Sequence, residues 1–568
     1  DKAIEWMQRV KAHRPDKPFL CYFSPGAVHT PLQVPDSWLD RFRGFFDEGW
    51  DALRQSIFER QLEMGVIPSG TVNTSRPDVV PSWDEYPDRY KPVARRLMEV
   101  FAAFLAHTDA QVARLIDALE GIDEWENTLF IYVTGDNGAS AEGRIDGTWS
   151  LPALQNGFEE DPEFLLEHIN DFGTEHSECH YNVGWAWALD APFQWMKQVA
   201  SHFGGTRNGL AVSWPRRITD AGAIRDQFHH VIDLAPTILD AAGIEPPTSV
   251  NGIDQMPIEG QSMLASFTDP GVEGRRTQYF EMMGNRGIYH EGFMASCFHG
   301  RVPWIRFGSV PFDGPQESWE LYDLRDDFSQ SHDLADERPE LLAEMRDLFD
   351  AECLRNGVYP LRDAAMNLDP AIRAPSVPVG VTRMTYTTAH VRMPERVVLN
   401  IKNRSYRITC DLEVPEGVPE GVIVCQGGSF NGWAIYLDEG RPTWHYNLYG
   451  HVRTTVAAVE PLAPGRREVA LLFDSDGGFG AGGTATLAVD GQVVGQARLE
   501  QTVPVVFAMG GESFDVGTDT GSPVGPYPHG FTCTATIGSV NVELLGEVDE
   551  ATRTAVAAGL FHAESVAQ

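Results

Sequence analysis

The sequence has no long apolar run and comparatively few positive charges. No stretch approaches the ~20 consecutive apolar residues that a membrane-spanning helix needs, so we expect no membrane as a partner. Lysine and arginine together number 44 against 81 aspartates and glutamates, which gives a formal net charge of −37. This charge argues against nucleic acid or an anionic membrane surface as a partner, although a locally positive site could still bind a small anion.

Cysteine is scarce and scattered. The seven cysteines are odd in number and show no CxxC or similar metal-ligand spacing. A reduced compartment is the simpler interpretation, so we expect a cytoplasmic protein rather than a secreted or periplasmic one. The chain shows no signal-peptide pattern either, since it opens directly in an amphipathic helical pattern, "DKAIEWMQRVKAH".

Residues 1–365 alternate strand-like apolar runs with helical patterns. "PFLCYF", "LFIYVT" and "GLAVSW" are typical of strands, while residues 91–120 have helical spacing and end at Gly121. Continuous apolar strands between helices predict an α/β domain with a mostly parallel sheet covered by helices on both faces.

The pattern changes beyond residue 365. Residues 366–380 are rich in proline and read as a linker. Residues 381–548 contain short alternating runs separated by turn signals, including the hairpin "LAVDGQVV" with Asp490-Gly491 as its turn. They predict an all-β sandwich, jelly-roll-like, and residues 549–568 predict a helical tail.

The stretch "LFIYVTGDNGAS" places an acid and an amide side by side after a strand. Ligands of open α/β sheets bind beyond the carboxyl ends of strands, which is where Asp136 and Asn137 are expected. Carboxylate and amide oxygens suit Ca²⁺ or Mg²⁺. The competing interpretation is a plain turn, since Asp-Asn-Gly is common turn chemistry.

Two further residues are candidates for the same region. His29 follows the strand-like "PFLCYFSP" and could hydrogen-bond an anionic oxygen or protonate a leaving group, or it could be a loop residue. Lys197 follows an aromatic cluster and precedes Gly204-Gly205-Thr206-Arg207. Its ammonium could meet an anion there, or it could extend to solvent as a surface lysine.

Taken together, five motifs in order resemble those of the type I sulfatases of the alkaline phosphatase superfamily. They are "FSPGAVHTPLQVP", "TLFIYVTGDNG", "KQVASHFGGTRNGLAVSWP", "HHVIDLAPTILDAAGI" and "WELYDLRDDFSQSHDLA". The resemblance covers roughly residues 1–355. The nearest kin by this pattern are large bacterial arylsulfatases with an appended β-domain, which "SFDVGTDTGSPV" also resembles.

The resemblance implies an alkaline-phosphatase-like fold and hydrolysis of a small sulfate ester, an arylsulfatase activity. It implies that Asp136 and Asn137 ligate Ca²⁺, that His29 assists departure of the leaving group, and that Lys197 binds a sulfate oxygen. Lys197 lies one residue further from the Gly-Gly pair than in some relatives.

The resembled family uses a formylglycine nucleophile, made from the cysteine of Cys-x-Pro-x-Arg or Cys-x-Ala-x-Arg by a maturation enzyme. None of the seven cysteines begins such a motif. We therefore expect the chain to be the later part of a longer protein and to be inactive by itself.

Two other functions stay open. A phosphonate monoester or phosphodiester hydrolase of the same superfamily would use the same metal ligands with a different nucleophile. A non-catalytic sulfate- or glycan-binding relative would use no nucleophile. Three local patterns have structural alternatives. "HSECH" (residues 176–180) has the look of a soft-metal cluster, Trp185, Trp187, Phe193 and Trp195 could line a substrate pocket, and the β-domain aromatics Trp433, Tyr436, Trp444, Tyr446 and Tyr449 could stack on sugars.

Overall fold

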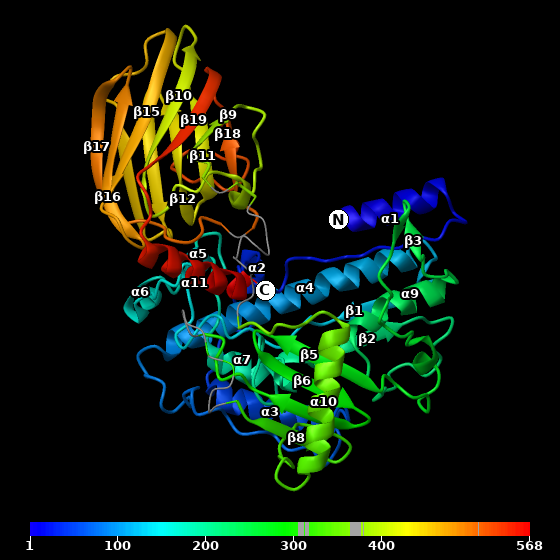
Figure 1. Cartoon of the computed structure of the whole chain (residues 1–568). Helices are drawn as coiled ribbons and strands as arrows, with labels where there is room; N and C mark the ends of the chain where they lie inside the picture. Colours follow the sequence, from blue (N-terminus) through cyan, green and yellow to red (C-terminus); the bar gives the residue numbers. More distant parts are fainter. Residues whose placement is uncertain are drawn as a thin grey trace. The chain divides into compact units, whose positions relative to one another are not determined.

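The computed structural model of the chain describes residues 1–304, 310, 312, 317–363, 376–378, 380–508 and 510–567. These residues form two compact units (Figure 1). The first contains residues 1–147, 162–304 and 317–363, and the second contains residues 148–161 and 376–567. Of the expected linker 366–380, residues 366–375 and 379 lie outside the described residues. Within the described parts, no helix is long and apolar enough to cross a bilayer.

The helices of the first unit follow the apolar periodicity. The long helix α4 spans Lys91–Glu120 and ends at Gly121, as the sequence predicts, and it buries Val93, Leu97 and Val100. The other helices are α1 (Lys2–His13), α2 (Asp36–Leu39), α3 (Gly49–Glu63), α6 (Pro162–Glu167), α7 (Val183–Leu189), α8 (Phe203–Thr206), α9 (Leu234–Ala242) and α10 (Pro339–Arg355), with 3-10 turns at Trp125–Asn127, Val231–Asp233 and Leu264–Phe267.

The two strands next to the candidate site pair with each other. Strand β1 (Phe130–Val133) is antiparallel to β2 (Leu210–Ser213), with Val133 opposite Leu210. The end of β1 and the start of β2 therefore lie together, which brings the loop after β1 beside the segment that leads into β2. The α/β character of the unit is confirmed, but the mostly parallel sheet is not formed by these strands, because their pairing is antiparallel.

The expected strand at "PFLCYF" is not formed. Residues 18–23 form no strand, and apart from the half-buried Phe19 their side chains are exposed to solvent, with Tyr22 90% exposed. No strand among the described residues forms backbone hydrogen bonds with this stretch. A strand needs a partner for its N–H and C=O groups, so an apolar run without one stays unassigned.

A second sheet lies under the helix α10 (Figure 1). Strands β5 (Thr277–Met282), β6 (Asn285–His290), β7 (Phe293–Cys297) and β8 (Trp319–Asp323) form an antiparallel sheet in that order. Ile288, Ala295 and Leu321 of the sheet pack against Met345 and Phe349 of α10. A short hairpin, β3 (Ser249–Val250) with β4 (Ile253–Asp254), completes the strands described in this unit.

The second unit is the expected β-sandwich. One sheet has the strand order β17-β16-β15-β10-β19-β9 and the other has β14-β13-β12-β11-β18. The strands are β9 (Arg383–Tyr386), β10 (Ser405–Val414), β11 (Gly421–Gly428), β12 (Asn431–Asp438), β13 (Arg441–Leu448), β14 (Val452–Ala457), β15 (Gly465–Ser475), β16 (Ala481–Val489), β17 (Gln492–Gln501), β18 (Ser513–Val516) and β19 (Thr536–Leu545), preceded by the helix α5 (Leu151–Gln155), with a 3-10 turn at Glu395–Val397, and followed by the helix α11 (Glu550–Ala567).

The hairpin and the tail of this unit match the sequence. Val489 pairs with Gln492 across Asp490 and Gly491, which have φ values of 47° and 79°, the left-handed conformation that a two-residue hairpin turn requires. The aromatic residues proposed for sugar stacking are all core residues. Trp433, Tyr436, Trp444, Tyr446 and Tyr449 are each no more than 4% exposed.

One segment of the second unit comes from early in the chain. Residues 148–161 leave the first unit and contribute α5 to the second. Asn156 fixes this excursion, because its side chain accepts from the N–H groups of Val505 and Val506 and donates to the Val506 carbonyl at 2.8–3.1 Å. No local pattern in the sequence indicates this segment, since its partners lie about 350 residues away.

Candidate active site

The loop after β1 lies directly against the segment that carries Lys197. The Gly138 N–H donates to the Gly205 carbonyl at 3.1 Å, and the Lys197 N–H donates to the Ala139 carbonyl at 3.1 Å. A Cβ atom at Gly138 would lie 1.7 Å from the Gly204 carbonyl oxygen. Glycine is therefore required here for close approach of two backbones, whereas Gly138 itself does not have the positive φ that a sharp turn would use.

Asp136 and Asn137 occupy the outer part of this loop. Asp136 is exposed and Asn137 is half-buried, and the Asn137 amide donates to the Asp136 carboxylate at 2.8 Å. The Asn208 side chain hydrogen-bonds to the backbone of this loop. With its nitrogen toward the Asn137 carbonyl (2.8 Å) and its oxygen toward the Asn137 N–H (3.1 Å), it mimics one rung of a strand pair.

Lys197 is buried and paired with a carboxylate. Its ammonium lies 3.3 Å from Oε1 of Glu142, and both side chains are no more than 6% exposed. Gln198 donates to the same Glu142 oxygen at 3.0 Å. Trp195 and Gln198, on either side of Lys197, have φ values of 63° and 76°, so the turn is held in a conformation that costs about 1–3 kcal/mol per residue. Glu142 thus anchors a strained turn with Lys197 at its centre.

A hydrogen-bonded chain leads from Glu142 to a histidine. Ser140 Oγ lies 2.6 Å from Glu142 Oε2 and 2.8 Å from Nε2 of His180. His180 Nδ1 lies 2.9 Å from the Tyr181 carbonyl. Burial lowers the pKa of His180 to about 4, although the Glu142 carboxylate opposes this effect.

His29 reaches the same region from a third loop. Thr30 Oγ1 donates to the Cys179 carbonyl at 2.9 Å, and the Leu32 N–H donates to that same carbonyl at 3.4 Å, which seats the His29 loop beside His180. His29 is exposed, and its Nδ1 lies 2.8 Å from the Thr30 carbonyl. Since a carbonyl only accepts, Nδ1 carries a proton and Nε2 is left for a ligand.

Comparison with known proteins finds sulfatases over much of the chain. The family model described as Sulfatase matches residues 1–244, and the model described as N-sulphoglucosamine sulphohydrolase, C-terminal, matches residues 193–350. The chain belongs to the type I sulfatase family. An uncharacterized sulfatase of Schizosaccharomyces pombe is 29% identical over 60% of this chain and 59% of its own length. An arylsulfatase of Klebsiella aerogenes is 29% identical over 45% of this chain and 53% of its own length.

The chain spans little more than half the length of these two curated relatives. The crystal structure of Ps i-CgsB is 17% identical and has a TM-score of 0.37 over 64% of this chain and 55% of that one.

The aromatic residues before Lys197 serve mainly as core. Trp185 and Trp187 are no more than 4% exposed, and Trp185 packs edge-on against Trp50 at 5.6 Å. Phe193 is likewise buried, while the half-buried Trp195 stacks on Phe298 at 4.3 Å. Three of these four residues are therefore packed in the core and do not line a substrate pocket.

The "HSECH" stretch is not a metal cluster in the described residues. Cys179 Sγ donates to the Leu32 carbonyl at 3.7 Å, and both ring nitrogens of His180 have partners other than a metal ligand. The described residues contain one group of three with metal-ligand types in reach of each other, and it includes neither.

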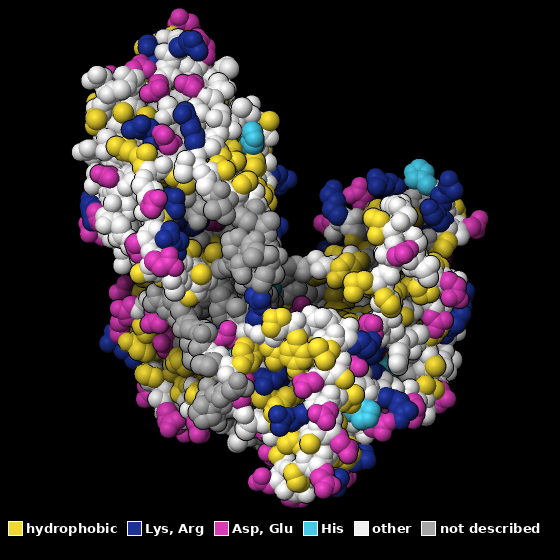
Figure 2. All heavy atoms as spheres, in the orientation of Figure 1, with side chains coloured by type: hydrophobic (Ala, Val, Ile, Leu, Met, Phe, Trp, Pro, Cys, Tyr) yellow, Lys and Arg dark blue, Asp and Glu magenta, His cyan; other side chains and the backbone are white. Residues whose placement is uncertain are grey.

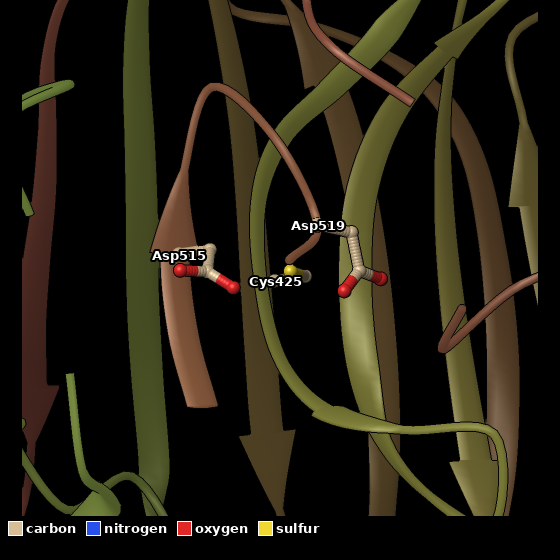
Figure 3. Close-up of side chains that lie close together, drawn as sticks. All are labelled: Cys425, Asp515 and Asp519. Atoms are coloured by element: carbon tan, nitrogen blue, oxygen red, sulfur yellow. The ribbon is translucent and has the colours of Figure 1, made fainter. Parts of the chain in front are cut away.

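That group is Cys425, Asp515 and Asp519 in the β-sandwich (Figure 3). Its carboxylates are already held by donors. Asp515 Oδ2 accepts from Ser513 and twice from Thr520, and Asp519 accepts from the Tyr527 hydroxyl at 2.8 Å and from two backbone N–H groups. The trio therefore organises the loop after β18, and we assign it no ligand.

The structure thus joins the loops of all four residues that the sequence singled out. It adds Ser140, Glu142 and His180, which the sequence did not identify as a unit, and Asn208. "GDNGASAEG" contains Ser140 and Glu142 within six residues of Asp136, so their nearness was visible. Their link to Lys197 was not, because it depends on a contact across 55 residues. On the face shown in Figure 2, acidic and basic side chains are interspersed, so the net charge of −37 does not gather in one patch there.

Proposed function

We propose that the protein to which this chain belongs hydrolyses a small sulfate ester to an alcohol or phenol and inorganic sulfate, as an arylsulfatase does. The observation that carries the proposal is the meeting of the Asp136-Asn137 loop with the Lys197 turn, in a chain of the sulfatase family. A carboxylate and amide beside a lysine combine a cation site with an anion site, which is what recognition of a sulfate group needs.

The donor chemistry at the loop fits Ca²⁺, with Mg²⁺ as the alternative. Asp136 is exposed and has no cationic side chain within ion-pair distance among the described residues, and Asn137 adds an amide oxygen. These two residues supply only part of the roughly 6–8 oxygens that Ca²⁺ takes. When bound, the ion would neutralise charge on the sulfate oxygens.

The chain's own side chains then have distinct roles. Lys197 would hold a sulfate oxygen through its ammonium group. His29 would act through Nε2, since its Nδ1 proton is committed to the Thr30 carbonyl. To protonate the departing oxygen, His29 must enter the reaction doubly protonated, with the second proton on Nε2.

The nucleophile is proposed to be a formylglycine made by a maturation enzyme from a cysteine outside this chain. It would supply a hydroxyl group that attacks sulfur. None of the seven cysteines here starts the required motif, so we expect the chain by itself to release no sulfate.

The test is a turnover assay on the protein that contains this chain together with the segment encoded immediately upstream of it, produced with and without a formylglycine-generating enzyme. We expect 4-nitrophenyl sulfate hydrolysis only after maturation, with losses of at least 100-fold for Lys197→Ala and Asp136→Ala. A matched control is Lys2→Ala, which changes an exposed lysine of the first helix. Hydrolysis of a phosphonate monoester or phosphodiester in place of the sulfate would assign the chain to that branch. Sulfate binding without any turnover would favour a binding protein.

A further inference from the structure

The chain of side chains behind Lys197 has no role in the proposed function. His180, Ser140 and Glu142 lie in sequence along one hydrogen-bonded path, with contacts of 2.8 Å and 2.6 Å, and Glu142 then meets the Lys197 ammonium at 3.3 Å. His180 and Glu142 are no more than 3% exposed. Water is therefore excluded from most of the path.

Counting protons along this path shows a shortage. His180 Nδ1 must carry a proton, because its neighbour is a carbonyl. In a neutral ring, Nε2 is then an acceptor, and the ionised Glu142 carboxylate is an acceptor as well. The Ser140 hydroxyl between them has a single proton to give and is already an acceptor for the Glu142 N–H at 3.4 Å. Two short contacts thus share one proton.

One additional proton would satisfy the whole path. With Nε2 protonated, His180 donates to Ser140, and the Ser140 hydroxyl donates to Glu142. Each atom then has the role that its distances require. The positive charge on His180 would offset the negative charge of the Glu142 carboxylate. The Lys197 ammonium would then no longer be needed to balance Glu142.

We propose that binding of a sulfate-type anion at Lys197 is coupled to the uptake of one proton by the His180–Ser140–Glu142 path. The proton comes from solvent and resides on Nε2 of His180. This inference rests on the proposed function, because it needs an anion at Lys197. It specifies which group pairs with the Lys197 ammonium: Glu142 in the free protein, and the anion in the complex.

The charged surroundings of His180 allow this exchange. Glu142 favours the protonated ring, while Lys197 and His29 disfavour it, and the Tyr181 carbonyl fixes its tautomer. In the free protein burial keeps His180 neutral, with a pKa lowered to about 4. An anion that draws the Lys197 charge away from Glu142 leaves the carboxylate unpaired and raises the proton affinity of the ring.

The experiment counts protons directly. Potassium sulfate is titrated into the 568-residue chain at pH 6 in unbuffered salt with calcium chloride, at constant ionic strength, and a pH-stat records the acid needed. Binding is followed separately by equilibrium dialysis with radiolabelled sulfate, and Lys197→Ala, which removes the buried ammonium, should abolish it. We expect uptake of about half a proton or more per bound sulfate.

Two variants isolate the path from His29, which lies in the same region. Glu142→Gln keeps the shape of the side chain and removes its charge. We expect it to lose most of the proton uptake and to bind sulfate at lower sulfate concentration, whereas a loss of structure would raise that concentration. Ser140→Ala should lose the uptake through the broken path. Ser262→Ala is the matched control, because Ser262 is an exposed serine that also bonds a carboxylate, Asp240.

The outcomes separate the two proposals. Sulfate binding that requires Lys197 but shows no proton uptake, or shows equal uptake in Glu142→Gln and wild type, overturns the coupling and leaves the proposed function standing. Absence of sulfate binding, or equal binding in Lys197→Ala and wild type, overturns the coupling together with the role given to Lys197. If Ser140→Ala does not fold, the Glu142→Gln result decides alone.

Discussion

The glycine at the end of Gly135-Asp136-Asn137-Gly138 provides a sharp test of how the site is assembled. A methyl group at Gly138 would lie 1.7 Å from the Gly204 carbonyl oxygen and 3.1 Å from the backbone nitrogen of Lys197. Since unstrained contacts need about 3.5 Å, the two loops would have to separate by more than about 1 Å. Two backbone hydrogen bonds, from Gly138 to Gly205 and from Lys197 to Ala139, would then stretch or break.

The cost of Gly138→Ala follows from these contacts. Losing two hydrogen bonds and forcing an overpacked contact should destabilise the loop pair by about 2–5 kcal/mol. Gly135→Ala is the matched control, because its methyl group would meet nothing closer than the Asn137 carbonyl at 3.3 Å. We expect that variant to change stability by less than about 1 kcal/mol.

Hydrogen exchange of the intact chain measures the difference locally. Peptides covering residues 129–141 and 194–206 should exchange at least about 30-fold faster in Gly138→Ala than in wild type, and nearly unchanged in Gly135→Ala. Identical protection of both peptides in Gly138→Ala and wild type would refute the reasoning, because the two loops would then not depend on their close approach.

Three further predictions address other parts of the chain. Burial alone would raise the pKa of Asp233, but hydrogen bonds from His229, Arg275 and two backbone N–H groups hold it well below its ordinary value. A depressed folded-state pKa gives stability that is present above about pH 4 and is lost as the pH falls below it. Asp233→Asn should therefore make the free energy of unfolding of the first unit less dependent on pH below about pH 4. An unchanged pH dependence would contradict this. Asn156→Ala removes buried hydrogen bonds between residues 148–161 and the sandwich and should cost about 2–4 kcal/mol, seen as earlier proteolysis within 148–161; wild-type resistance would count against that anchor. Cys21 is the exposed thiol among the seven, so an aromatic disulfide reagent should label one cysteine rapidly, and Cys21→Ser should abolish that phase.

Local patterns predicted the elements that depend on local chemistry. The helix at residues 91–120 and the hairpin at Asp490-Gly491 agree with the structure, because spacing and turn residues decide them. The run at residues 18–23 failed for the opposite reason. Its composition is that of a buried strand, but a strand exists only with a partner, and the described residues provide none.

The site shows the same division. His29, Asp136, Asn137 and Lys197 could be named from short motifs, since each follows an apolar run in a recognisable order. The surroundings that decide their chemistry could not. Lys197 was expected among aromatic side chains, yet its ammonium is paired with Glu142, which the sequence offers no reason to prefer over the other acids of an acidic chain.

That pairing explains how the Lys197 ammonium can be buried. An isolated ammonium in the interior would cost several kcal/mol, and the Glu142 carboxylate offsets that cost. The same carboxylate would repel an incoming anion if its charge stayed in place. A site that must hold Lys197 charged before the anion arrives, and release its charge afterwards, needs a way to neutralise Glu142 on demand. The Ser140 hydroxyl, placed between two acceptors with one proton to share, provides that means at the cost of one proton from solvent.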